Sequence, residues 1–372
     1  MAELERLFRM ADEAAEEGVQ LLADLIRFET VNTGVMPTGS ELPLCRHLRD
    51  WLAGEGITSQ ILESGENRGN LVARLPGSAG TPRLLYMGHI DVVPVENPQD
   101  WRFPPFSGTV ADGRIWGRGA ADMKDMVAAE LMALVILGRA GIPLRGDLIV
   151  AAAADEETGG KYGFGWLAEH APETIRADYA INEGGGGPVP TPAGTAYEIT
   201  VGEKGRLELH ITLQGEATHA ASPWQGDNVS FKLAEVLRRL QNWQPEIDVS
   251  QPFFKELAAL LGRGEPVTVG NVDALADELS KVSRGLGSEM RGLSRMTLVP
   301  TMFNGGVKSN IVPAVCELVC DVRTLPWQDE AYVRRQVDQV LAGIEGARYE
   351  LIYTAITNAS QYDTPLAAAI QS

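Results

Sequence analysis

Three stretches decide the fold of this chain: LLYMGHID at residues 84–91, DLIVAAAADEE at 147–157 and DYAINE at 178–183. Each one contains a short apolar run, and the first two runs are almost wholly apolar, as in strands buried on both faces of a sheet. Helical patterns at 123–140 and 162–170 separate the three runs. Strand, helix, strand, helix, strand in this order predicts an α/β fold with a mainly parallel sheet and flanking helices.

The residues before this pattern extend the same domain. Helical periodicity at 4–28 and 40–54 predicts a pair of N-terminal helices. The β-rich runs ITSQILES (57–64) and NLVARLPG (70–77) follow, separated by a polar turn, and predict two further strands. The sheet should therefore hold more strands than the three in the deciding stretches.

After residue 183 the character of the sequence changes. Residues 184–197, GGGGPVPTPAGTAY, carry no charge and no periodicity, which predicts a loop or hinge at a domain boundary. YEITVGEKGRLELHITLQG (197–215) alternates like an antiparallel hairpin, a helix is expected at 228–243, and two further strands should flank a helix at 328–343. This mixture predicts an α+β second domain, with helices and loops at 244–298.

Composition excludes several classes of protein. The chain holds 32 Lys and Arg against 50 Asp and Glu, a net charge of −18, whereas a nucleic-acid binder needs a basic face. No apolar run approaches the roughly 18 to 20 residues of a membrane span, and the acidic start has no signal-peptide core. Three cysteines are too few for a disulfide scaffold, and Cys316 and Cys320 share one face of a predicted strand, which indicates core packing. We expect a soluble cytoplasmic protein without nucleic-acid or membrane partners.

The deciding stretches end in residues that can bind a metal ion. His89 and Asp91 follow the first strand, Glu156 and Glu157 the second, and Glu183 the third, while Asp122 precedes a helix. Ligands of open α/β sheets bind at the carboxyl ends of the strands, so these side chains should converge there. Clustered carboxylates raise each other's pKa, and a divalent cation removes that cost.

Oxygen and imidazole ligands suit Zn²⁺ and its neighbours. We assign His89 as a ligand and Asp91 as the group that accepts its second ring N–H. Of two adjacent glutamates, one can bind metal while the other takes a proton from water.

Ordinary explanations exist for each acid taken alone. Asp122 could cap a helix, and Glu156, Glu157 and Glu183 could be solvated loop acids. Together they favour a metal site, because several separate segments would otherwise all end in acids by accident. A nucleotide-dependent α/β enzyme is disfavoured, because the glycine clusters match no phosphate-binding motif.

Six motifs also resemble one known family. The chain is similar, over about residues 20–372, to the M20 family of metallopeptidases and deacylases, which includes acetylornithine deacetylase, succinyl-diaminopimelate desuccinylase, aminoacylase and glutamate carboxypeptidase. The motifs, in family order, are GHIDVVP (88–94), WGRGAADMKDM (116–126), ADEETGG (154–160), INEGG (181–185), ATHAASPWQGDN (217–228) and NGGVKSNIVP with CDVRTLP (304–313 and 320–326).

The resemblance implies a site with two divalent metal ions, Zn²⁺ first, with Co²⁺ or Mn²⁺ as alternatives. In it Asp122 bridges both ions, His89 and Glu183 complete one, and Glu157 binds the other. Glu156 is the general base and then the general acid, and Asp91 supports His89. The implied reaction is hydrolysis of an amide bond in an N-acyl amino acid or small peptide with a free carboxylate.

The resemblance also implies a lid domain that forms a homodimer. On this basis we expect the N-terminal part of a catalytic domain at 1–197, a lid at 198–357 and the start of a return to the catalytic domain at 358–372. His219 corresponds to a lid histidine that steadies the oxyanion in the neighbouring subunit's site. Asn310 and Arg323 correspond to lid residues that bind substrate, and Arg323 is suited to a bidentate hold on a carboxylate.

One departure from the family pattern concerns a metal ligand. The family supplies a second histidine from a C-terminal segment, whereas the five histidines of this sequence are His47, His89, His170, His210 and His219. We therefore expect a chain truncated relative to the family. The alternative hypothesis is an inactive metal-binding or dimerising fragment.

Overall fold

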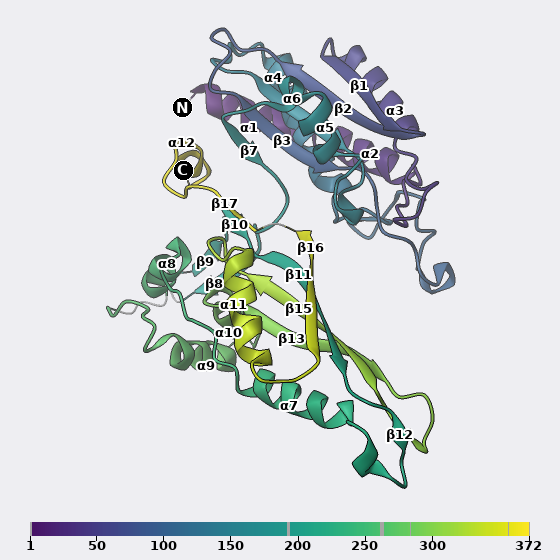
Figure 1. The fold of residues 1–372 in the computed structure, drawn as a ribbon. Helices are drawn as coiled ribbons and strands as arrows, with labels where there is room; N and C mark the ends of the chain where they lie inside the picture. The colour runs from purple at the N-terminus through teal and green to yellow at the C-terminus, as the bar shows by residue number, and fades with distance from the viewer. Residues whose placement is uncertain (1, 192–193, 261–263, 283, 356, 372) are drawn as a thin grey trace. The chain divides into compact units, whose positions relative to one another are not determined.

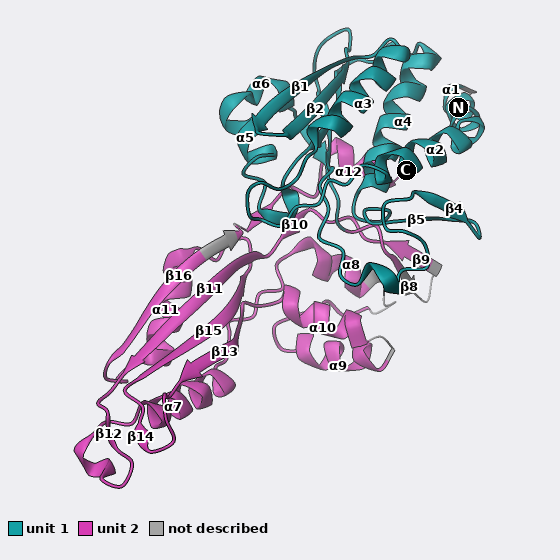
Figure 2. Cartoon of the chain, turned by 90° about the vertical axis from the view of Figure 1, so that its right-hand side faces the viewer, with its two compact units in different colours: residues 1–184 teal, residues 185–372 magenta. Residues whose placement is uncertain are grey.

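The computed structural model describes residues 2–191, 194–260, 264–282, 284–355 and 357–371. The chain forms two compact units, Met1–Gly184 and Gly185–Ser372 (Figures 1 and 2). The domain limits expected at residues 197 and 357 stay predictions. Among the described residues, no helix has the length and apolar character that crossing a membrane requires.

The first unit contains a five-stranded sheet. Its strands, in spatial order, are β1 (Thr58–Gly65), β2 (Arg68–Leu75), β6 (Leu148–Ala153), β3 (Leu84–His89) and β7 (Tyr179–Ile181). The strands β6, β3 and β7, which come from the three deciding stretches, pair in parallel as predicted. The strand β2 runs against both of its neighbours, so the sheet is mixed but four of its five strands point the same way. The α/β fold class is confirmed.

Helices surround this sheet (Figure 1). The predicted N-terminal helix at 4–28 is divided at Ala14 into two helices, and a short hairpin of β4 (Thr109–Ala111) and β5 (Arg114–Trp116) precedes the long helix α4. The helices of this unit are α1 (Ala2–Glu13), α2 (Ala15–Ile26), α3 (Leu42–Gly54), α4 (Lys124–Ala140), α5 (Phe164–His170) and α6 (Pro172–Ile175).

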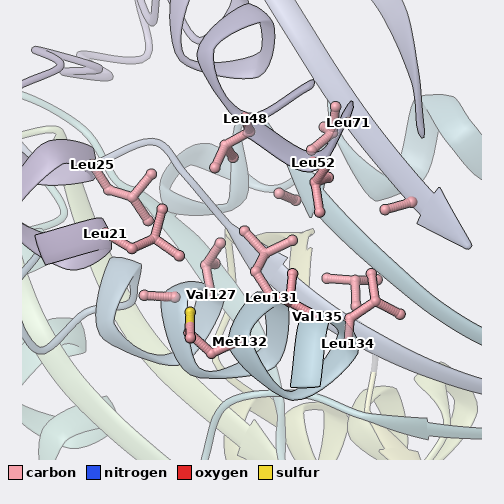
Figure 3. Packing of buried hydrophobic residues seen from close by; sticks show 14 of the residues in the cluster. Leu21, Leu25, Leu48, Leu52, Leu71, Val127, Leu131, Met132, Leu134 and Val135 are labelled. Carbon is pink, nitrogen blue, oxygen red and sulfur yellow. The ribbon is translucent and has the colours of Figure 1, made fainter. Parts of the chain in front are cut away.

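The apolar pattern of β6 explains why helices cover both faces of the sheet. Successive strand residues point to opposite faces. Leu148 and Val150 join the large core with α2, α3 and α4, while Ile149 and Ala151 join a smaller core that includes Phe164 of α5. Figure 3 shows leucine, valine and methionine side chains of the large core. Because β6 is buried on both faces, its residues are apolar throughout and do not alternate with polar ones, as the sequence predicted.

The second unit is built around an antiparallel sheet covered by helices. In spatial order its strands are β13 (Thr297–Gly305), β15 (Val315–Thr324), β11 (Gly205–Gln214) and β16 (Ala347–Ala355). Buried leucines and isoleucine of β11 alternate with polar residues and pack with α7 (Val229–Asn242) and α11 (Glu330–Leu341). Asn228 and Asp329 cap these two helices by accepting a backbone N–H. Cys316 and Cys320 lie in this core, as expected.

The remaining elements of the second unit are short strand pairs and a helical group. The helices α8 (Pro252–Leu260), α9 (Val272–Val282) and α10 (Arg284–Leu293) form a separate core, and α12 (Pro365–Gln371) ends the chain. The strand pairs are β8 (Pro188–Thr191) with β9 (Gly194–Tyr197), β10 (Gly202–Glu203) with β17 (Asn358–Ala359), and β12 (Thr218–His219) with β14 (Ile311–Val312).

Two predictions for this unit were wrong. The stretch at 184–197 was expected to be a loop, but its two strands β8 and β9 pair as an antiparallel hairpin. The stretch at 197–215 was expected to be a hairpin, but β10 and β11 belong to different sheets and pair with strands more than a hundred residues away. Alternation marks a strand without identifying its partner, which is decided by the core that the strand joins.

Candidate metal-dependent active site

The acids and the histidine of the deciding stretches lie at one end of the first unit's sheet. His89 is the last residue of β3 and pairs with Ala153, the last residue of β6. Glu156 and Glu157 begin a short helical turn directly after β6, and Glu183 follows β7. Asp122 precedes α4, whose N-cap residue is Met123, so Asp122 is not the helix cap of the alternative explanation.

Three of these residues form a potential metal site. One ligand atom each of His89, Asp122 and Glu183 lies within 4.8 Å of the other two, and this is the one such group among the described residues. The Nε2 atom of His89 is 3.1 Å from Asp122 Oδ1 and 3.6 Å from Glu183 Oε1. The His89 side chain is 1% exposed and the Asp122 side chain 67%, so the group is anchored inside and open to solvent.

The hydrogen bond on the other side of His89 leaves Nε2 available for a cation. Its Nδ1 lies 2.9 Å from the backbone carbonyl oxygen of Asp91 and 3.4 Å from the Asp91 carboxylate. Donation from Nδ1 fixes the tautomer with a lone pair on Nε2. The closer contact is thus the backbone carbonyl rather than the carboxylate that the sequence analysis assigned. The orienting role of Asp91 stays a prediction.

The carboxylate of Asp91 instead accepts hydrogen bonds from the backbone of Glu156 and Glu157. Its Oδ1 accepts the backbone N–H of Glu156 at 3.1 Å, and its Oδ2 accepts that of Glu157 at 3.3 Å. Asn32 donates to the same Oδ2 at 2.8 Å. Asp91 therefore links the His89 strand end to the turn that carries Glu156 and Glu157.

The electrostatics of the cluster favour a positive charge. Burial acts to lower the pKa of His89, but hydrogen bonds to Asp91 and Glu183 outweigh it and raise the pKa to about 11. Burial raises the pKa of Glu156 and of Glu157, and neighbouring carboxylates add to both shifts. A protonated imidazole or a divalent cation can supply the charge, and a donor set of one imidazole nitrogen and two carboxylate oxygens suits a transition-metal cation. The residues therefore fit a metal ion.

The two adjacent glutamates differ in their relation to this group. The Oε2 atom of Glu156 lies 3.8 Å from His89 Nε2, and its side chain is half exposed, so it is a carboxylate beside the three ligands and not one of them. Glu157 also lies outside the three-ligand group, although the Asp122 charge raises its pKa. The assignment of Glu157 to a second ion stays a prediction.

The other predicted site residues belong to the second unit. His219 lies in β12 and accepts the backbone N–H of Ala221 at Nδ1, and the Asn310 carbonyl oxygen accepts the N–H of Ala220 at 3.0 Å. Arg323, near the end of β15, donates to Asp321 at 2.8 Å and is 44% exposed. His219 and Asn310 thus lie on adjoining segments, whereas Arg323 lies on a different strand.

Sequence reasoning missed the polar residues buried behind the site. Asn32, Glu41 and Arg68 are 2% exposed or less, and hydrogen bonds connect them to Asp91 and Asp155. Glu41 directly precedes α3, Arg68 begins β2 and Asn32 lies in the loop between α2 and α3, all positions where exposed polar residues are common, so no pattern distinguished them. Their contacts join residues 27 to 123 positions apart, which a local pattern cannot reveal.

Comparison with known proteins identifies the family. Residues 85–371 match the peptidase family M20/M25/M40. A protein of Staphylococcus epidermidis named "Probable succinyl-diaminopimelate desuccinylase" is 28% identical over 355 residues, covering 94% of this chain and 79% of the relative.

Solved structures show the same fold. A metallo-carboxypeptidase of the M20 family from Sulfolobus solfataricus superposes with a TM-score of 0.63 at 20% identity, covering 95% of this chain and 82% of the other. Human carnosine dipeptidase 1 gives 0.63 at 17%, covering 98% and 83%. A protein of Bacillus subtilis described as a dinuclear metal binding peptidase gives 0.54 at 16%, covering 93% and 76%. The chain therefore belongs to peptidase family M20/M25/M40 and is a metallohydrolase that acts on amide bonds.

Proposed function

We propose that this protein hydrolyses an amide bond in an N-acyl amino acid or small peptide whose free carboxylate lies beside the bond, with Glu156 as general base and then general acid. One observation carries the proposal: the free carboxylate of Glu156 lies 3.8 Å from the Nε2 of His89, next to the three-ligand group. The names of the relatives, a desuccinylase, a carboxypeptidase and a dipeptidase, support this substrate class.

His89, Asp122 and Glu183 would hold one cation, and Asp122 together with Glu157 would hold a second. Zn²⁺ is the first choice, with Co²⁺ or Mn²⁺ as alternatives, because imidazole and carboxylate ligands suit all three. When bound, such cations lower the pKa of water and polarise the substrate carbonyl. The burial that raises the pKa of Glu156 brings its carboxylate closer to the proton affinity that a general base needs near neutral pH.

Glu156 carries the proton through the reaction. Its carboxylate takes one proton from water as the water oxygen forms a bond to the carbonyl carbon. The carbon–nitrogen bond then breaks, and Glu156 returns the proton to the leaving amine. The backbone N–H groups of Glu156 and Glu157 donate to the Asp91 carboxylate, and these hydrogen bonds keep the Glu156 side chain beside the ligands.

The second unit would complete the site within a homodimer. We assign His219 to the oxyanion of the neighbouring subunit's site, and Asn310 and Arg323 to the substrate carboxylate. Large apolar side chains that are 66% to 92% exposed support an interface, because association would remove them from water: Trp224, Phe231, Met302, Phe303 and Val307. We expect the dimer to work in the cytoplasm.

The test combines cation binding with hydrolysis of a panel of N-acyl amino acids and dipeptides. Replacing Glu156 with Gln should lower kcat by about 10² to 10⁴-fold and leave cation binding intact, because the residue moves protons without being a ligand. Replacing Asp122 with Ala should abolish both. Glu173→Gln, on the exposed helix α6, is the matched control and should change neither.

Full activity in the Glu156→Gln variant would refute the proposal. Cation binding without hydrolysis of any substrate in the panel would instead favour the inactive metal-binding fragment.

A further inference from the structure

A buried chain of charged and polar residues leads from the interior of the first unit to the active site. Arg68, at the start of β2, is fully buried between two acids. Its Nε donates to Glu41 at 2.9 Å and its Nη2 to Asp155 at 3.1 Å, and both carboxylates are also buried. The Arg68 guanidinium lies 5.2 Å from the centre of the Tyr162 ring.

Stability alone does not account for this arrangement. Burying an arginine and two carboxylates costs solvation energy, and well-packed apolar residues in their place are often as stable or more so. The packing around the pair is also tight: a Cβ added to Gly39 would lie 2.5 Å from Arg68 Nε and 2.6 Å from Glu41 Oε1. Gly39 has a φ of +90°, which favours glycine, so the backbone itself covers the ion pair.

Asp155 connects the buried Arg68 to Glu156, the proposed general base. It directly precedes Glu156 and has a left-handed φ of 71°, a conformation that is strained for a residue other than glycine. Such a conformation persists only where the surroundings enforce it. Asp155 Oδ1 accepts from Arg68, from Asn32 at 3.0 Å and from Thr158 at 2.8 Å, and Oδ2 accepts the backbone N–H of Tyr162 at 3.0 Å.

Asn32 connects two segments of the site, the one that follows β3 and the one that follows β6. Its Nδ2 donates to Asp91 Oδ2 at 2.8 Å and to Asp155 Oδ1 at 3.0 Å. Asp91 in turn contacts His89 and accepts the N–H groups of Glu156 and Glu157. A single buried amide therefore fixes the strand end that carries His89 relative to the turn that carries the glutamates.

We propose that Arg68 and Asn32 are positioning residues for amide hydrolysis: through Asp155 and Asp91 they hold the backbone of Glu156 at a fixed place beside His89. The inference rests on the proposed function, because it takes Glu156 as the proton carrier. Neither residue is placed among the ligands or in contact with substrate. Their effect should therefore appear in kcat and in the order of the 155–162 segment.

The first experiment replaces Arg68 with Met, which keeps the volume and removes the charge. We expect kcat to fall about 10- to 100-fold, a range typical of residues that support a metal site from behind. KM and cation affinity should change less than about threefold, because Arg68 is placed neither among the ligands nor in contact with substrate. Arg68→Lys should recover only part of kcat, because a lysine cannot bond Glu41 and Asp155 through a planar fork. An unchanged kcat in a folded Arg68→Met enzyme would overturn the proposal.

The second experiment measures the segment itself, without activity. Hydrogen exchange followed by mass spectrometry measures how well backbone N–H groups are protected. The N–H groups of Glu156 and Glu157 donate to Asp91, and that of Tyr162 donates to Asp155. Asn32→Leu removes the shared amide at similar volume, so peptides covering 154–163 should exchange faster than in the wild type. Exchange as slow as in the wild type would contradict the role of Asn32.

A destabilised core variant is the control that separates a positioning role from a general loss of stability. Leu134→Ala creates a cavity in the large core, which destabilises the unit, and leaves every residue of the network in place. It should lower the melting temperature without selective exchange at 154–163. Equal acceleration in Leu134→Ala and Asn32→Leu would show a structural role only.

The two proposals fail in different ways. If Glu156→Gln keeps wild-type turnover, the proposed function fails while the exchange result still tests the network. If Glu156→Gln is inactive but Arg68→Met and Asn32→Leu turn over normally, only the positioning role fails. If Arg68→Met does not fold, Asn32→Leu provides both the kinetic and the exchange measurement.

Discussion

The two units hold their candidate functional residues in opposite ways. In the first unit His89 and Asp91 are 1% exposed or less, and hydrogen bonds connect them to three other segments, at Asn32, Asp122 and Glu156. In the second unit the exposed side chain of His219 accepts the backbone N–H of Ala221, and Arg323 contacts an acid two residues away. The first set is therefore organised by the fold, whereas the second set has local contacts, which is consistent with the proposed roles in binding substrate and in a dimer.

The two sheets also differ in how helices cover their faces. Helices cover both faces of the first sheet, and its carboxyl end is where the acids converge. In the second unit α7 and α11 cover one face, and β11 presents Arg206, Glu208 and His210 on the other. If this difference is functional, changes in the second unit should act through assembly or substrate binding, while changes in the first unit act on the site itself.

The largest expected effect in the second unit is at His219. His219→Ala should lower kcat by about 10² to 10³-fold, as expected for loss of one oxyanion donor. Mixed with Glu156→Gln chains, it should regain about one quarter of wild-type activity, because half of randomly mixed dimers are mixed and each contains one intact site. Steady-state kinetics after mixing and exchange of subunits measures this.

The control for this experiment is His210→Ala, which removes another partly exposed histidine of the same unit, paired with Glu208 on β11. It should leave kcat unchanged. A mixture as inactive as its two components would show that His219 does not act across the dimer, and the comparison between the units would then lose its main support.

A smaller effect is expected at Arg323. Arg323→Lys keeps the charge but loses one of two parallel hydrogen bonds to a carboxylate, a cost of about 1.5 kcal/mol, so KM should rise roughly tenfold. The kcat should change little, since the contact is the same in the ground and transition states. Arg334→Lys on α11 is the control. A fall in kcat at constant KM would mean that Arg323 acts on the reacting bond.

The convergence of the first unit's site could be predicted from sequence for a physical reason. Apolar runs separated by helices force a parallel arrangement, and parallel strands bring their carboxyl ends to one edge. His89 and Glu183 come together by this rule, and Asp122 joins them from the segment that precedes α4. Their place in the sheet follows from local pattern, without knowledge of any side-chain contact.

Long-range pairing could not be predicted in this way. The strand β10 pairs with β17, and β11 lies between β15 and β16, although local alternation in 197–215 favoured a hairpin. The buried network of Asn32 and Arg68 also escaped prediction, because its hydrogen bonds depend on how β2, β3 and β6 are placed side by side. Local patterns specify the faces of an element, while partners are specified by the whole fold.

The smallest effect on activity is expected at Glu130, a buried acid of the first unit that lies outside the network of Asn32 and Arg68. It lies on α4 at 6% exposure, and neither carboxyl oxygen has a hydrogen-bond partner among the described residues. Burial raises the pKa of Glu130 from 4.5 to about 8. The folded protein therefore holds this proton more tightly than the unfolded chain, so stability is full below about pH 4.5 and is lost as the pH rises towards 8.

Glu130→Met removes this titration and keeps the volume. At pH 9 the variant should be more stable than the wild type by about 2 to 4 kcal/mol, and near pH 5 the difference should almost vanish, because the wild-type carboxyl is then neutral. Urea unfolding across this pH range measures it, with Glu169→Gln on α5 as an exposed control. Turnover should stay unchanged, in contrast to Arg68→Met. A variant less stable than the wild type at pH 9 would show that the Glu130 carboxylate has a stabilising partner.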